Sequence, residues 1–105
     1  MVTGVSVVLV TAPSEELAAS MARTLLDEGR IACANLVPKV RSIYRWKGTV
    51  YDEAEVLMVL KAPSASFEAL KARIVELHPY ETPEVLRLEV AEGHRPYLDW
   101  VLGTT

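Results

Sequence analysis

Two short segments of the chain, residues 5–10 and 56–60, carry apolar side chains on both of their alternating faces. A strand of this kind is typical of the centre of a sheet that is covered on both sides. The rest of the chain must therefore supply the elements that flank these two strands and cover them.

Helical patterns follow each of the two apolar segments. Ser14 is a suitable N-cap residue, and Leu17, Met21 and Leu25 recur at i, i+4 and i+8, so a helix is predicted over residues 14–29. Residues 62–64 open a second helix with apolar residues at i, i+3, i+7 and i+10. It ends at His78, because the proline that follows disfavours a helical residue before it.

Residues 31–46 and 50–61 predict the two arms of one long hairpin. Lys47 and Gly48 supply the turn, and Pro38, which has no N–H for a sheet ladder, marks a bulge or an edge position. Residues 84–90 predict a fourth strand, and Pro96 suits the first turn of a short C-terminal helix.

The predicted order is β-α-β-β-α-β with a short helix at the end, in one domain over residues 1–105. This is the ferredoxin-like split βαβ pattern, an α+β fold in which right-handed crossovers place both main helices on one face of an antiparallel sheet. The other face needs cover from the terminal helix, from a second copy of the chain, or from both.

The length of the hairpin also predicts a homo-oligomer. Arms of about 12 residues reach ~40 Å, whereas a helix of about 15 residues spans ~22 Å. The tip therefore extends beyond the helices, and an isolated two-stranded ribbon is marginal in water. Tyr44, Trp46 and Tyr51 near the tip are expected to pack on a neighbouring subunit.

The charge balance and the apolar pattern exclude several classes of partner. Eleven basic and 14 acidic residues give a net charge of −3, so general affinity for nucleic acid or an anionic membrane is not expected. The longest apolar run, residues 56–60, is far shorter than the roughly 20 residues of a membrane helix. The first basic residue is Arg23, which argues against a secretory leader, so the cytoplasm is the expected compartment.

The densest group of polar residues is the loop of residues 78–83, which contains two prolines. His78 and Glu81 lie three residues apart and can reach one metal ion or a small ligand. Imidazole at a helix C-terminus can equally stabilise the helix, and Tyr80 and Glu81 can equally anchor the loop. Both interpretations stay open.

Cys33 lies among small alanines in a predicted strand. It is either a small buried apolar residue or a soft ligand for Cu(I) or Zn(II). As the single cysteine of the chain, it cannot form an internal disulfide.

A basic and aromatic strand follows, in which Ser42, Tyr44 and Trp46 share one face and Ile43 and Arg45 the other. Such a strand can bind RNA, but the two central strands have no aromatic residues on which bases could stack, which favours packing between subunits. The sequence has no glycine-rich phosphate loop after its first strand and no readable catalytic triad, so we do not expect an enzyme.

Four separated motifs resemble the CutA divalent-cation tolerance family and together span almost the whole chain. They are VLVTAP at residues 8–13, ACANLVP at 32–38, SIYRW at 42–46 and HPYETPE at 78–84, followed by YLDW at 97–100.

The resemblance implies a ferredoxin-like homotrimer similar to the PII signalling proteins, with its hairpins packed between subunits. It implies a cytoplasmic protein linked to tolerance of copper and other divalent cations, in which His78 and Cys33 match the family's histidine and strand cysteine. Val10 and Leu77 stand where some members carry a further cysteine and histidine, and neither can ligate copper. The family's polar cleft between subunits maps onto Cys33, Lys61, Tyr44, Trp46, Tyr80 and Glu81.

Two functions follow as hypotheses. The first is a trimer that binds copper or another divalent ion at a subunit boundary through His78, Glu81 and Cys33. The second is a PII-like trimeric sensor or interaction scaffold whose clefts bind a small ligand or a partner, with only an indirect effect on metal tolerance. An enzyme that uses the same cleft is a third.

Overall fold

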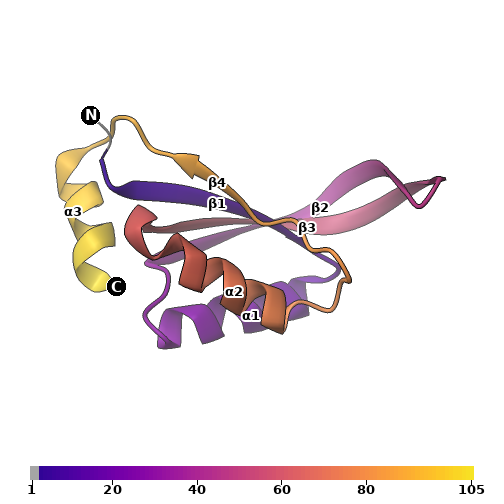
Figure 1. The fold of residues 1–105 in the computed structure, drawn as a ribbon, viewed down its shortest axis with the longest axis horizontal. Coiled ribbons are helices and arrows are strands. Elements are labelled where there is room, and N and C mark those ends of the chain that lie inside the picture. Colours follow the sequence, from indigo (N-terminus) through magenta and orange to yellow (C-terminus); the bar gives the residue numbers. More distant parts are fainter. Residues whose placement is uncertain (1–2) are drawn as a thin grey trace.

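The computed structural model describes residues 3–105, which form a four-stranded sheet and three α-helices (Figure 1). The elements are β1 (Val5–Ala12), α1 (Glu15–Asp27), β2 (Cys33–Trp46), β3 (Thr49–Pro63), a 3-10 turn (Ser64–Ser66), α2 (Phe67–Leu77), β4 (Leu86–Glu89) and α3 (Arg95–Thr104).

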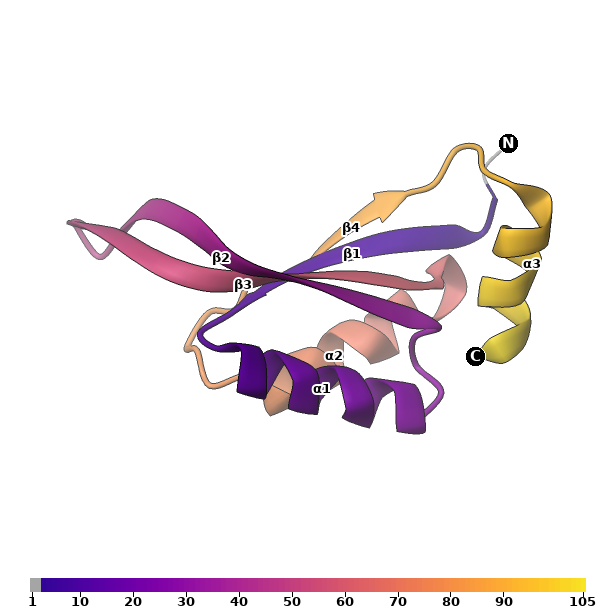
Figure 2. The same cartoon turned by 180° about the vertical axis from the view of Figure 1, so that it is seen from behind.

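The strands lie in the order β2-β3-β1-β4, and every neighbouring pair is antiparallel. Both α1 and α2 lie on one face of this sheet, as Figures 1 and 2 show from opposite sides. The predicted α+β fold and its element order are therefore confirmed.

The local signals that predicted the helices act as expected. The Ser14 hydroxyl accepts a hydrogen bond from the N–H of Leu17 at 3.1 Å, which caps the start of α1. His78 has extended backbone geometry at the end of α2, where the following proline stops the helix.

The fourth strand is shorter than predicted. It pairs with β1 only from Leu86 to Glu89, whereas the sequence suggested residues 84–90. The pairing begins with Leu86 opposite Leu9, so residues 84 and 85, which follow Pro83, lie before the ladder. Single backbone bonds continue the contact beyond the strand, since the N–H of Val90 donates to the carbonyl of Val5 at 3.0 Å.

The main core lies between the sheet and the two helices. Its fully buried side chains come from alternate positions of β1 and β3 and from the two helices: Val8, Val10, Met58 and Leu60 of the strands, Leu25 of α1, and Leu70 and Ile74 of α2. Burial of this apolar surface is what fixes the helices on the sheet.

The terminal helix covers the end of the sheet. Leu98 and Val101 of α3 pack with Val5 and Ala32, so α3 caps the edge where β1 begins (Figure 1). Leu86 and Leu88 remain 54% and 53% exposed in one chain. The predicted need for cover from a second copy of the chain therefore stands as a proposal.

The β2–β3 hairpin projects beyond the helices, and the molecule is 44 Å along its longest axis (Figure 1). Lys47 and Gly48 both have positive φ, 50° and 81°, as a type I′ turn requires. Next to Pro38 the register shifts by one residue between Val37 and Val40, and Lys39 has a φ of 60°. The predicted turn and bulge are both confirmed.

Within residues 3–105, none of the helices combines the length and the hydropathy that spanning a membrane requires.

Candidate functional site

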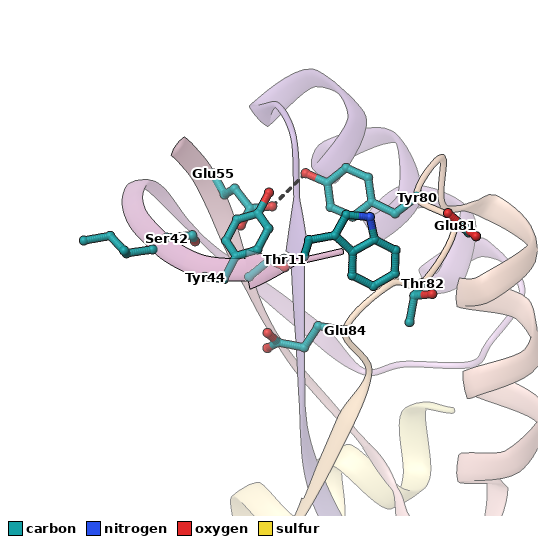
Figure 3. A pocket seen from close by; sticks show the side chains of 10 residues that line it. Thr11, Ser42, Tyr44, Glu55, Tyr80, Glu81, Thr82 and Glu84 are labelled. Atoms are coloured by element: carbon teal, nitrogen blue, oxygen red, sulfur yellow. Dashed lines mark hydrogen bonds between the residues drawn. The ribbon is translucent and has the colours of Figure 1, made fainter. Parts of the chain in front are cut away.

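An open pocket of about 550 Å³ lies between the hairpin and the loop that joins α2 to β4 (Figure 3). Its lining residues come from β1, β2, β3 and that loop: Thr11, Ser42, Ile43, Tyr44, Trp46, Glu55, Tyr80, Glu81, Thr82 and Glu84. Tyr44, Trp46, Tyr80 and Glu81, four of the seven site residues expected from the sequence, thus meet in one cavity.

His78 holds the loop that lines this pocket. Its side chain is only 7% exposed, and its Nε2 lies 2.7 Å from the carbonyl oxygen of Thr11. The N–H of Tyr80 donates to Nδ1 at 3.2 Å, so Nε2 carries the proton and donates to Thr11. In this arrangement both ring nitrogens are occupied, and His78 fixes the start of the loop on β1.

A buried carboxylate forms one wall of the pocket. Glu55 is only 7% exposed, and the hydroxyl of Tyr80 donates to its Oε2 at 2.7 Å (Figure 3). Burial and this bond to Glu55 raise the pKa of Tyr80, which therefore stays protonated. Burial also raises the pKa of Glu84, and the negative charge of Glu55 adds to that shift.

The hairpin contributes aromatic side chains and further charge. The Tyr44 ring stacks on Tyr51 with 5.4 Å between centroids. The Tyr44 hydroxyl donates to Glu53, and this bond raises the pKa of Tyr44 to about 12. At the rim, the Lys47 ammonium lies 3.2 Å from Glu81 Oε2 and 5.5 Å from the centre of the Trp46 ring.

Cys33 and Lys61 lie outside this pocket in a single chain. They face each other across β2 and β3, and Lys61 in turn pairs with Val7. Thr11 is four residues further along β1, roughly 13 Å away at ~3.3 Å per residue. Cys33 Sγ and Lys61 Nζ both contact the side chain of Asn35. Within one chain these two residues therefore lie apart from the pocket.

The described part of the chain does not complete a metal site by itself. Over residues 3–105, no three histidine, cysteine, aspartate or glutamate side chains come close enough to hold an ion together. His78, Glu81 and Cys33 therefore do not form a ligand set by themselves.

Sequence reasoning missed the carboxylates of Glu55 and Glu84. The two-residue turn places Trp46 opposite Thr49, which already predicts that Ser42 faces Glu53. The same register pairs Val40 with Glu55. The loop from α2 then covers this carboxylate, through the bond that Tyr80 donates to it. That packing is not visible in local sequence.

Fold and site together define a ferredoxin-like α+β protein with an acidic, aromatic pocket. The family model of the CutA1 divalent ion tolerance protein matches residues 6–104. The chain belongs to this family, whose description is that of an ion tolerance protein and not of an enzyme.

Relatives with known sequences and structures support this membership. A divalent-cation tolerance protein CutA from Thermus thermophilus is 48% identical over 99 residues, which cover 94% of this chain and 96% of that protein. The human protein CutA is 43% identical over 101 residues, which cover 96% of this chain but 56% of the human protein.

Two solved structures share the fold closely. The Thermus thermophilus divalent cation tolerance protein has a TM-score of 0.92 and 46% identity over 96% of this chain and 98% of its own. A protein from Archaeoglobus fulgidus, named a periplasmic divalent cation tolerance protein, has a TM-score of 0.92 and 30% identity over 95% and 97% of the two chains.

Proposed function

We propose that this protein contributes to divalent-cation tolerance as a homotrimer that binds copper or another divalent ion at a site completed between subunits. The observation that carries this proposal is that the model of the CutA1 divalent ion tolerance family matches residues 6–104. The same chain leaves Leu86 and Leu88 exposed and extends a hairpin into solvent. Neighbouring copies would cover these surfaces and bring further ligands to the pocket.

The three proposed ligands differ in what they need before they can bind. Glu81 is exposed at the pocket rim and has only to release Lys47. His78 must give up its bond to Thr11, because a ring nitrogen cannot hold a proton and a metal at once. Cys33 has to come from another subunit.

We place this protein in the cytoplasm.

A calorimetric Cu(II) titration of tag-free protein, with the assembly state measured by light scattering, tests the proposal. We expect a mass of about 35 kDa, three times the 11.6 kDa of one chain, because trimers bury the open face. Binding at a fixed ratio per trimer should weaken in Glu81→Gln, His78→Ala and Cys33→Ser.

Matched controls are His94→Ala, which removes the other histidine at an exposed position, and Glu92→Gln, which changes the same charge in an exposed turn. Binding that is equally weak in the parent and in all five variants would contradict a metal site at these residues. A monomer at micromolar concentration would contradict the trimer.

A second candidate function is a trimeric sensor or interaction scaffold that binds a small ligand. The pocket itself favours it, because about 550 Å³ with three aromatic walls has the size and composition of a small-molecule site. In this case metal tolerance would be an indirect effect. Metal-independent binding of a small molecule in the pocket would support it.

A further inference from the structure

We propose that the pocket binds a small organic cation, an alkylammonium ion such as a primary amine or diamine, with Glu55 and Glu84 as its counter-charges. This inference rests on the second candidate function, since it requires the pocket to be a ligand site, and it names the class of ligand.

The first argument is the charge of the lining. Glu55, Glu81 and Glu84 contribute three carboxylates, and the ten described lining residues include no lysine, arginine or histidine. Glu55 is nine-tenths buried, and its carboxylate accepts a hydrogen bond from the neutral hydroxyl of Tyr80. Lys47 pairs with Glu81, whereas within one chain no lining group neutralises Glu55 or Glu84, and a bound cation would do so.

The second argument is the aromatic walls. Tyr44, Trp46 and Tyr80 line the same space, and the face of an aromatic ring attracts an ammonium group. The hydroxyls of Tyr44 and Tyr80 already donate to Glu53 and Glu55. The ring faces carry no oxygen and pack well against the methylene groups of an alkyl chain.

The third argument is that the ammonium group of Lys47 contacts both an aromatic ring and a carboxylate at this pocket. Lys47 Nζ lies 5.5 Å from the centre of the Trp46 ring and 3.2 Å from Glu81. The rim of the pocket thus already accommodates an alkylammonium between an aromatic ring and a carboxylate. A free amine would make the same kinds of contact with the pocket's aromatic rings and with Glu55 and Glu84.

The spread of the carboxylates favours an organic cation over a divalent metal in this pocket. Over residues 3–105, no three acidic, histidine or cysteine side chains are close enough to share one ion. A hard divalent ion prefers six or more oxygen ligands at short range, which this lining does not supply. A diamine, with its charges at two ends, can meet separated carboxylates.

The test uses 1,4-diaminobutane as the probe and 1,4-butanediol as its uncharged counterpart. In a Trp100→Phe background Trp46 is the remaining tryptophan, so its fluorescence reports on the pocket. We expect a saturable change with the diamine and none with the diol. The diamine should bind at least about tenfold more weakly in Glu55→Gln and in Glu84→Gln, since each removes a counter-charge.

Two further variants sharpen the result. Glu92→Gln removes the same charge far from the pocket and should leave the affinity within about twofold. Lys47→Asn should tighten binding, because it removes the competing ammonium while asparagine tolerates the positive φ of the turn. If Glu55→Gln fails to fold, Glu84→Gln decides, because Glu84 is exposed.

The inference is overturned if the diamine gives no saturable change, if the diol gives the same change, or if Glu92→Gln weakens binding as much as the pocket variants do. Loss of diamine binding with intact Cu(II) binding would reject this inference and leave the proposed metal function standing. Diamine binding without Cu(II) binding would support this inference and contradict the proposed metal function.

Discussion

Replacement of His78 by alanine separates a structural role from a metal-binding one. The substitution removes the bond to the Thr11 carbonyl and the acceptor of the Tyr80 N–H. A polar group left without its partner costs about 1–3 kcal/mol, and the lost burial of the ring adds roughly 1 kcal/mol. We therefore expect the metal-free protein to lose about 2–4 kcal/mol of unfolding free energy.

The assay is urea unfolding at a fixed protein concentration with a chelator present, because the stability of an oligomer depends on concentration. His94→Ala is the control and should leave the midpoint unchanged. His78→Gln should recover part of the loss, since its amide can donate to Thr11. If His78→Ala unfolds at the parent's midpoint without metal and differs only when Cu(II) is added, the anchoring role is wrong.

Three further perturbations test the core and the titrating groups. Leu25→Ala should lower the free energy of unfolding in urea by about 2–5 kcal/mol, because Leu25 is fully buried. Leu26 lies on the same helix and is 43% exposed, so Leu26→Ala should cost far less. Equal losses would contradict the assigned core. Bonds from two arginines lower the pKa of Glu28 to about 2, so its contribution to stability is complete above the ordinary value of 4.5 and is lost as the pH falls toward 2. At near-neutral pH, the melting temperature of Glu28→Gln should accordingly be lower than that of the parent protein. At pH 2 the two melting temperatures should converge. Glu53→Gln should bring the pKa of Tyr44 down from about 12 toward 10 in an ultraviolet titration, and an unchanged value would refute the bond to Glu53.

Local patterns were sufficient for part of the site. The turn at Lys47 fixes the pairing of Tyr44 with Tyr51, so the aromatic face of the hairpin follows from alternation alone. The loop from His78 to Tyr80 was also identifiable as the densest polar segment. That the aromatic face of the hairpin and this loop line the same pocket was not predictable, because it depends on how the loop from α2 crosses the end of β1.

The sequence by itself determined the order of strands and helices, the turn of the hairpin and the bulge at Pro38. Each of these depends on residues within a few positions of one another, through alternation, capping and backbone restriction. Tertiary structure alone decided that Glu55 is buried beside Tyr80 and that Cys33 lies far from His78. Those relations arise from strand pairing and from packing between segments distant in the chain, which no local pattern encodes.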